Sequence, residues 1–219
     1  MKLIVVRHGE TVWNAERRVQ GRGHNSPFTK CGLRQIRRIA HKLRKEKIDV
    51  VYTSCLSRCI ETVEAAIKGK GDVPVILDQR LNQRNWGTLG GLARAEVGQR
   101  FPESGYDTHG QTIDPHKKFI FRPPGGETWG EVGERLKEFL REIFKTHSGD
   151  QTVVILTHTA ISRSLTAVLT GIDLWKVDRP VNRTNIHTFT VEPIGNDAYR
   201  IRNPWFTLWY KSSWSHLFQ

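Results

Sequence analysis

Short apolar runs separated by amphipathic patterns fill the first third of the chain, and this alternation constrains the fold more than any other feature. The run at 3–6 is typical of a buried strand, 49–53 is typical of a second strand, and 73–77 of a third, shorter one. Apolar residues recur at helical spacing from Leu33 to Leu43, and again from Ile60 to Ile67. Strands and helices that alternate in this way predict a parallel sheet with right-handed crossovers.

The second half of the chain repeats the pattern and then changes it. A long helix is expected after Gly125-Gly126-Glu127-Thr128, followed by a buried strand at 152–156 and a helix that stops at Gly171. The segments 186–191 and 198–201 are typical of a closing antiparallel pair. We therefore predict an α/β fold, a three-layer, doubly wound and mostly parallel sheet with helices on both faces.

Two regions of the single domain predicted over 1–219 depart from this pattern. The stretch 78–124 is rich in Gly, Pro, Arg and His and has weak periodicity. We expect it to be an insertion over the sheet edge that acts as a lid or a specificity wall. The aromatic tail at 203–219 is expected to pack onto the domain's own core, with a homodimer contact as the alternative.

Composition is that of an ordinary globular protein of the cytoplasm. Hydrophobic residues make up 37% of the chain, and no apolar run approaches the roughly 20 residues that span a bilayer. The first residues lead straight into a strand instead of a signal peptide. Three cysteines are an odd number, which favours reduced thiols, and Cys55 and Cys59 lack the further ligands that a metal site needs.

A net charge of +12 indicates that the surface favours anionic partners. This charge fits a phosphorylated metabolite, a nucleic acid or an anionic membrane equally well. Part of it lies on one face of the helix at 33–43, where Arg34, Arg37 and Arg38 are not interleaved with aromatic residues. A solvated surface therefore explains this face better than a nucleic-acid stripe, and we expect neither a nucleic-acid nor a membrane partner.

Two histidines and two arginines follow predicted strands at their carboxyl ends. Arg7 and His8 end the first strand, Arg58 begins the helix after the second, and His158 follows the strand at 152–156. The ends of parallel strands meet at one edge of a sheet, which is where α/β proteins bind ligands. Guanidinium groups neutralise phosphate oxygens and an imidazole nitrogen can attack phosphorus, so this set predicts a phosphoryl-transfer site.

These residues lie within an ordered set of motifs that covers nearly the whole chain and resembles the histidine phosphatase superfamily, which includes cofactor-dependent phosphoglycerate mutases and fructose-2,6-bisphosphatase. The motifs are Arg7-His8-Gly9-Glu10-Thr11, Trp13-Asn14, Gln20-Gly21, Ser26-Pro27-Phe28-Thr29 with Gly32, Tyr52-Thr53-Ser54 with Leu56-Ser57-Arg58, Gly125-Gly126-Glu127-Thr128, and Thr157-His158.

The resemblance implies a role for each matching residue. His8 would be the nucleophile that becomes phosphohistidine, and Arg7, Arg58 and His158 would form the phosphate pocket. Binding roles would fall to Asn14 and to the backbone N–H of Thr159, both toward the phosphate, and to Gln20, Gly21 and Arg84 on the substrate side. Neither a metal nor another cofactor is expected, because the arginines and histidines supply the positive charge that Mg²⁺ supplies in kinases.

Two positions depart from the family pattern. Thr159 stands where the family usually has Gly, which narrows the pocket wall but keeps the N–H. The segment Leu81-Asn82-Gln83-Arg84 resembles the family's Leu-Asn-Glu-Arg segment, with Gln83 in place of the catalytic Glu. The proton donor of the reaction is therefore in question at Gln83.

The sequence as a whole favours a phosphomonoesterase that acts on a small phosphorylated metabolite, such as a sugar phosphate or a phosphoglycerate-like acid, through a phosphohistidine. Two alternatives stay open. One is a cofactor-dependent phosphoglycerate mutase, although the segment 102–124 lacks the paired arginines and proline run of mutases. The other is a phosphate-binding protein with weakened catalysis, for which Gln83 is the reason.

Overall fold

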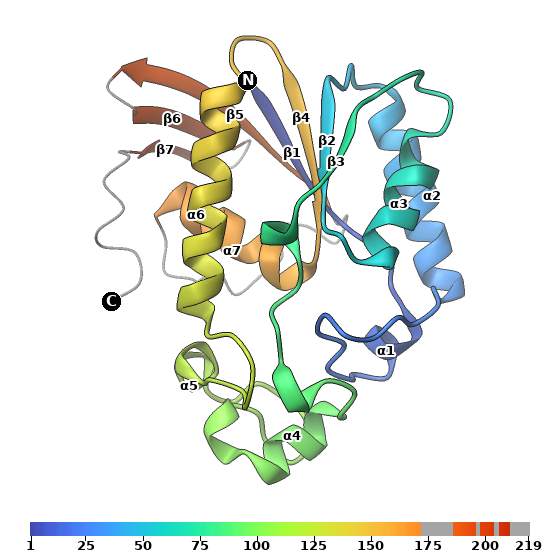
Figure 1. Cartoon of the computed structure of the whole chain (residues 1–219), viewed down its shortest axis with the longest axis vertical. Coiled ribbons are helices and arrows are strands. Elements are labelled where there is room, and N and C mark those ends of the chain that lie inside the picture. The colour runs from blue at the N-terminus through green and yellow to red at the C-terminus, as the bar shows by residue number, and fades with distance from the viewer. Residues whose placement is uncertain (172–185, 196–197, 204–205, 211–219) are drawn as a thin grey trace.

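The computed structural model describes residues 1–171, 186–195, 198–203 and 206–210. Within these residues one seven-stranded sheet runs in the order β3-β2-β4-β1-β5-β6-β7 (Figure 1). The strands β1 to β4 are parallel, and β5, β6 and β7 continue the sheet in antiparallel pairs. Their bounds are Lys2–Arg7, Val50–Thr53, Val75–Leu77, Thr152–Thr157, Ile186–Gly195, Ala198–Asn203 and Phe206–Tyr210 for β1 to β7.

Helices cover both faces of the parallel part of the sheet, because side chains alternate between its faces. Helices α6 (Trp129–Thr146) and α7 (Thr159–Thr170) bury one set, which includes Leu3, Val5 and Ile155. Helices α2 (Lys30–Arg44) and α3 (Ser57–Ile67) bury the other, which includes Ile4, Val6 and Val154. The sheet is therefore buried on both faces, and the carboxyl ends of its parallel strands lie at one edge.

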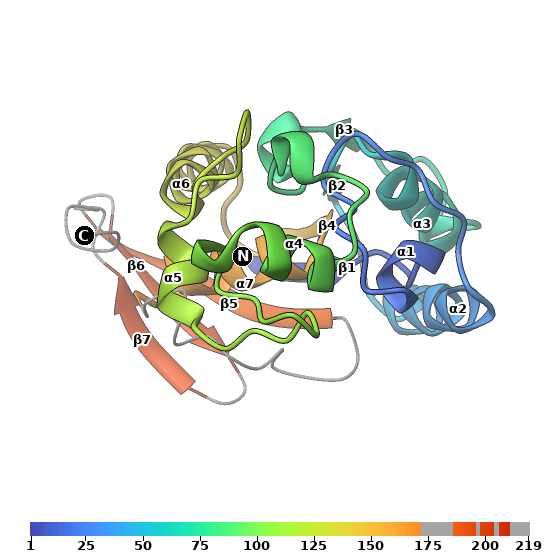
Figure 2. The same cartoon turned by 90° about the horizontal axis from the view of Figure 1, so that it is seen from below.

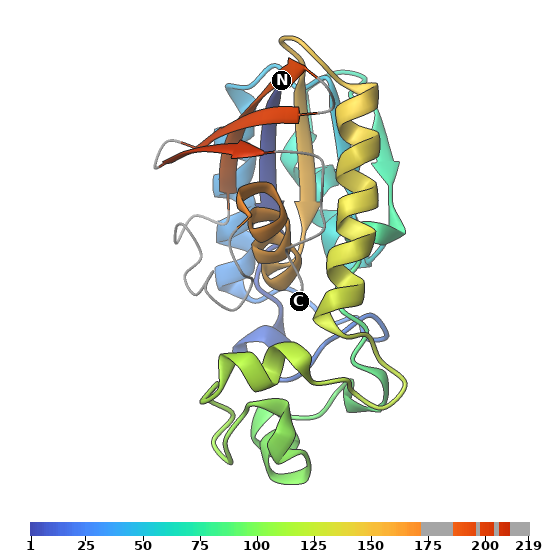
Figure 3. The same cartoon turned by 90° about the vertical axis from the view of Figure 1, so that its left-hand side faces the viewer.

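The region 78–124 lies beyond the carboxyl ends of the parallel strands, next to helix α1 (Val12–Ala15) (Figures 1, 2 and 3). It contains five short helices: η1 (Gln79–Leu81), η2 (Gly87–Leu89), α4 (Arg94–Arg100), η3 (Pro102–Ser104) and α5 (Pro115–Ile120). Trp86, Val97 and Tyr106 of this region belong to a small separate apolar cluster, which Val19 joins from the segment after α1.

The α/β architecture with helices on both faces is confirmed, as are the helix that ends at left-handed Gly171 and the antiparallel pair β5–β6. One feature is larger than expected, because β7 adds a third antiparallel strand from within the predicted aromatic tail. The other tail residues singled out from the sequence, including Trp205, Trp214 and Phe218, lie outside the described residues.

No helix in the described part of the chain is both long and apolar enough to cross a membrane. In the same part of the chain, no group of three or more His, Cys, Asp and Glu side chains is placed to hold a metal ion.

Candidate active site

The site begins with three strand ends that are tied together through the backbone. The N–H of His8, just beyond β1, donates to the carbonyl of Thr157 at the end of β4 (3.0 Å). The N–H of Ser54, just beyond β2, donates to the carbonyl of Leu156 (3.0 Å). These bonds continue the parallel ladders by one residue and bring the polar residues after each strand together. As a result the imidazole rings of His8 and His158 lie with their centroids 5.0 Å apart.

His8 is buried and presents one particular nitrogen for chemistry. Its Nδ1 lies 2.6 Å from the carbonyl oxygen of Gly9. A carbonyl oxygen can only accept a hydrogen bond, so the proton of neutral His8 is on Nδ1. Nε2 therefore carries the lone pair, which is the requirement for an attack on phosphorus.

Arg7 and Arg58 each keep a buried donor without a partner. The Nη2 of Arg58 donates to the carbonyl of Gly21 (2.9 Å), and the Nη2 of Arg7 donates to Oδ1 of Asn14 (3.4 Å). The Nε atoms of both arginines are buried and have no hydrogen-bond partner among the described residues. Buried N–H groups are almost always paired in proteins, so two such donors beside two histidines indicate the place of an anion.

Burial and like charge keep both histidines neutral. Burial, then the charges of Arg58 and Arg7, hold the pKa of His8 well below its usual value. The pKa of His158 is also held well below the usual value by burial and then by Arg58. Burial lowers the pKa of Arg58 to about 10, which still leaves it a cation at neutral pH. These four residues, Arg7, His8, Arg58 and His158, are called the phosphate half of the site after their predicted role. They join two neutral imidazoles to fixed cations.

His158 contacts Ser54, which in turn contacts Asn82, and the sequence assigned no role to either residue. Its Nε2 lies 2.9 Å from the hydroxyl of Ser54, and this hydroxyl lies 2.9 Å from Oδ1 of Asn82. Ser54 follows β2 as His8 follows β1, and this position after a central strand was the signal that could have identified it. No signal of that kind marks Asn82, which reaches Ser54 across 28 residues of chain.

The remaining predicted binding residues fall into two groups. Asn14, Gln20 and Gly21 lie with the phosphate half, since Asn14 bonds both Arg7 (3.4 Å) and Gln20 (3.4 Å), and Gly21 bonds Arg58. Thr159 is the first residue of α7, next to His158. Its N–H belongs to the first turn of a helix, where donors have no partner within the helix.

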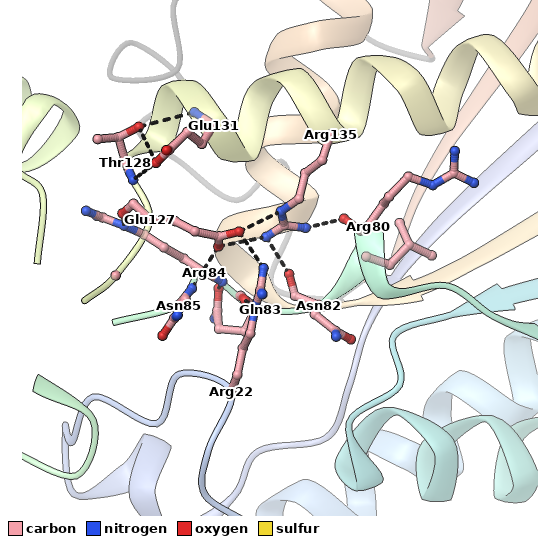
Figure 4. Close-up of polar contacts among 12 residues, drawn as sticks. Arg22, Arg80, Asn82, Gln83, Arg84, Asn85, Glu127, Thr128, Glu131 and Arg135 are labelled. Atoms are coloured by element: carbon pink, nitrogen blue, oxygen red, sulfur yellow. Dashed lines mark hydrogen bonds and ion pairs between the residues drawn. The ribbon is translucent and has the colours of Figure 1, made fainter. Parts of the chain in front are cut away.

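Gln83 lies in a segment that long-range bonds hold in place from both sides (Figure 4). Within this 82–85 segment, the carbonyl of Asn82 accepts from Arg135 (2.8 Å), and the carbonyl of Gln83 accepts from Arg22 (2.8 Å). The N–H of Asn85 donates to the carboxylate of Glu127 (2.8 Å). The Oε1 of Gln83 accepts from the N–H of Arg84 (2.9 Å), so the side chain is itself held.

Arg84 does not line the substrate side, and the prediction that it would is wrong. Its side chain is completely buried, and its guanidinium lies between the rings of Trp86 and Trp129, 4.5 Å and 4.9 Å from their centroids. It donates to the carbonyls of Glu127 (2.7 Å) and Phe121. Through these cation–π contacts and hydrogen bonds, Arg84 joins the 82–85 segment to the start of α6.

Two nearby carboxylates are already engaged in polar contacts. Glu127 is 2.5 Å from Arg22 and 3.3 Å from Arg135, with 19% of its side chain exposed. Glu10 accepts a hydrogen bond from the hydroxyl of Thr29 (2.7 Å). The two arginines thus hold Glu127 against the 82–85 segment.

Comparison with known proteins agrees with this geometry. A model of the histidine phosphatase superfamily, branch 1, matches residues 3–203. Phosphoserine phosphatase 1 of Hydrogenobacter thermophilus is 35% identical over 176 residues, which are 80% of this chain and 79% of that protein. A 2,3-bisphosphoglycerate-dependent phosphoglycerate mutase of Cytophaga hutchinsonii is 28% identical over 92% of this chain and 94% of its own length.

Among solved structures, that of YhfR from Bacillus stearothermophilus superposes with a TM-score of 0.76 and 30% identity, over 87% of this chain and 91% of that one. The chain belongs to the histidine phosphatase superfamily, as its motifs indicated. Its similarity to named phosphatases also confirms the expected class of enzyme, a phosphoric monoester hydrolase.

Proposed function

We propose that this protein hydrolyses phosphate monoesters of small metabolites, such as sugar phosphates or phosphoglycerate-like acids, with His8 as the nucleophile. The observation that carries the proposal is the state of His8. Its Nδ1–H is bound to Gly9, so the Nε2 lone pair is available beside the unpaired Nε donors of Arg7 and Arg58. Such an arrangement attracts a phosphoryl group and attacks it.

The reaction has two steps in this proposal. Nε2 of His8 attacks phosphorus, and the bond from phosphorus to the ester oxygen breaks as the phosphohistidine forms. Water then attacks the phosphohistidine and releases inorganic phosphate. The ester oxygen must gain a proton in the first step, and the amide of Gln83 has no proton to give up near neutral pH. Alcohol leaving groups are therefore expected to react slowly, and phenolic ones much less so.

Trapping the intermediate tests the proposal. The enzyme is mixed with a phosphate-labelled aryl ester and quenched, and the label should be acid-labile and base-stable. His8→Ala should carry no label, whereas His109→Ala, on the exposed surface, should carry as much as the unmodified enzyme. Label of the same stability in His8→Ala would overturn the role of His8.

A phosphate-binding protein with little turnover is the second candidate, and Gln83 favours it. A phosphatase and a phosphate-binding protein are distinguished by comparing phosphate release with the binding of vanadate, an inert analogue of phosphate. Tight vanadate binding without release from any member of a panel of phosphometabolites would favour the binding protein. Isomerisation of 3-phosphoglycerate that depends on 2,3-bisphosphoglycerate would instead support a mutase.

The cellular compartment of the enzyme, the role of its inserted region and its oligomeric state are also proposals. We propose a cytoplasmic enzyme in which residues 78–124 act as the lid, and three free cysteines support a reducing compartment. A homodimer is the alternative to a monomer, and sedimentation velocity over a range of concentrations separates the two.

A further inference from the structure

The hydroxyl of Ser54 has a complete set of partners that fixes where its hydrogen lies. Its oxygen is 2.9 Å from Nε2 of His158, 2.9 Å from Oδ1 of Asn82 and 3.3 Å from the backbone N of Leu56. A hydroxyl has one hydrogen to donate and two lone pairs to accept with. The N–H of Leu56 takes one lone pair, which leaves one hydrogen and one lone pair for His158 and Asn82.

Asn82 decides how these two are shared. Its Oδ1 is 2.9 Å from the backbone N of Cys55, and a backbone N–H is only a donor, so the atom facing it must be the amide oxygen. This oxygen can only accept from Ser54 as well. The single hydroxyl hydrogen of Ser54 therefore points to Asn82, and Nε2 of His158 must donate to the remaining lone pair.

If Nε2 of His158 accepted from Ser54 instead of donating to it, two buried acceptors would face each other without a hydrogen. If Ser54 donated to His158, the lone pairs of Ser54 and Asn82 would face each other at 2.9 Å in a site where Ser54 is completely buried. An unmade hydrogen bond between two buried acceptors is costly. The sulfur of Cys59 lies 3.7 Å from the carbonyl oxygen of Thr157 and 3.6 Å from Nε2 of His158. This thiol does not change the count, because a thiol that donated to Nε2 would still leave the lone pairs of Nε2 and Ser54 facing each other at 2.9 Å.

We propose that Ser54 and Asn82 are positioning residues that fix the proton of His158 on Nε2 and leave Nδ1 as the only ring nitrogen that exchanges a proton with the phosphoryl group. The proposal rests on the phosphatase function proposed above. His158 lies at the site because its ring is 5.0 Å from that of His8. The two histidines thus hold opposite tautomers, with the proton on Nδ1 in His8 and on Nε2 in His158.

This assignment gives His158 a defined part in the reaction. Burial, and then the charge of Arg58, lower the pKa of His158 and keep the free ring neutral. When a phosphoryl group binds, a proton from its oxygen can pass to Nδ1, which leaves a phosphate dianion and an imidazolium whose Nε2–H still donates to Ser54. The proton count is unchanged, and the imidazolium then donates to the phosphoryl oxygen. If the proton of His158 were on Nδ1 instead, the lone pair of Nε2 would face the lone pair of the Ser54 hydroxyl, and Nδ1 could not accept a proton from the phosphoryl group.

Nitrogen NMR of the ¹⁵N-histidine-labelled full-length protein tests the proposal without substrate. His158→Ala and His8→Ala assign the two rings. Neutral His158 should show a protonated Nε2 and a bare Nδ1, and His8 should show the reverse. A protonated Nδ1 in neutral His158 would overturn the proposal, and because no turnover is involved, this outcome is independent of whether the enzyme is a phosphatase.

Two variants of Asn82 should have different effects on the NMR signals of His158. Asn82→Leu removes the acceptor, so the hydroxyl hydrogen of Ser54 turns to His158 and the proton of His158 moves to Nδ1. Asn82→Asp keeps an acceptor and adds negative charge, so the proton stays on Nε2 and the pKa of His158 rises. Ser57→Ala, in the same turn with its hydroxyl on Asn25, is the control and should change neither.

Kinetics give a second readout. A catalytic histidine in the wrong tautomer can lose up to about 10⁴-fold in kcat. Asn82→Leu should therefore lower kcat by at least about tenfold, within this limit of about 10⁴-fold, and should change KM little. An unchanged tautomer in a folded Asn82→Leu variant would overturn the proposal. If that variant fails to fold, an unshifted His158 titration in Asn82→Asp would overturn it instead.

Discussion

The phosphate half of the site and the 82–85 segment are built in different ways. The phosphate half is assembled by sheet geometry, because His8 and His158 follow neighbouring parallel strands and the ladder of backbone bonds brings them together. The 82–85 segment has no strand to place it, and side chains from distant parts of the chain hold it. Arg22 and Glu127, for example, are 105 residues apart. The first half therefore depends on the fold, and the second depends on a few particular side chains.

Restoring a carboxylate at position 83 should give the largest effect. General acids contribute about 10² to 10⁴ in rate, so Gln83→Glu should accelerate hydrolysis of alkyl phosphates by a factor within that range. Aryl phosphates, whose leaving groups need little help, should gain far less. The ratio of kcat for the two ester classes is the measurement. Equal gains on both would show that another group supplies the proton.

In the phosphate half, Arg58→Lys should cost activity although it keeps the charge. A planar guanidinium can bind Gly21 and a phosphate at once, whereas Lys is a point charge. Losing a hydrogen bond to a charged group costs about 1.5–3 kcal/mol, or about 10- to 150-fold in kcat/KM. Arg34→Lys, on the exposed face of α2, is the matched control. Full activity of Arg58→Lys would place Arg58 outside the pocket.

Removing the charge of Glu127 should affect the 82–85 segment more than the phosphate half. Glu127→Gln weakens the bonds to Arg22 and Arg135, and leaving a partly buried cation underpaired costs about 1–3 kcal/mol. Urea unfolding should show this loss, while trapping of phosphate on His8 should persist. Glu138→Gln, exposed on α6, should be neutral. Loss of trapping in a folded Glu127→Gln variant would contradict the separation of the two regions.

The neutral histidines of the phosphate half should make stability depend on pH. Their pKa values are lowered by folding, so below about pH 6.5 the unfolded chain binds more protons than the folded one. The free energy of unfolding should therefore decrease as the pH is lowered below this value, by about 1.4 kcal/mol per histidine per pH unit. Urea unfolding between about pH 7.5 and about pH 5.5 measures the slope. His109→Ala should leave the slope unchanged, and a flat profile would mean that the histidines are not buried as neutral groups.

The smallest effect is expected on the exposed basic face of α2, which belongs to neither region. Arg37→Ala combined with Arg38→Ala should leave kcat nearly unchanged. At most it should weaken the dependence of kcat/KM on salt, because surface charges act over about 10 Å at 0.1 M salt. Rates measured over a range of ionic strengths check this. A large loss of kcat at high salt would mean that this face contributes to the site.

What could be predicted from the sequence follows the same division. His8 and Arg58 could be placed because an apolar run and the polar residue after it are adjacent in the chain, and parallel strands share an edge. Arg84 was misplaced because its position depends on Trp86 and on Trp129, which begins helix α6 more than 40 residues later. Ser54 could have been identified from its position directly after β2. Asn82 could not, because its contact with Ser54 is a tertiary hydrogen bond, which leaves no periodic pattern in the sequence.

The stacking of Arg84 between Trp86 and Trp129 has an optical consequence. Both indoles lie within 5 Å of one guanidinium, and one belongs to the inserted region while the other begins α6. Any opening of the inserted region away from α6 would separate a cation from at least one indole and expose that indole to water. Intrinsic fluorescence would therefore report the opening directly, with no added dye, and a single Trp86→Phe or Trp129→Phe change would show which indole gives the signal.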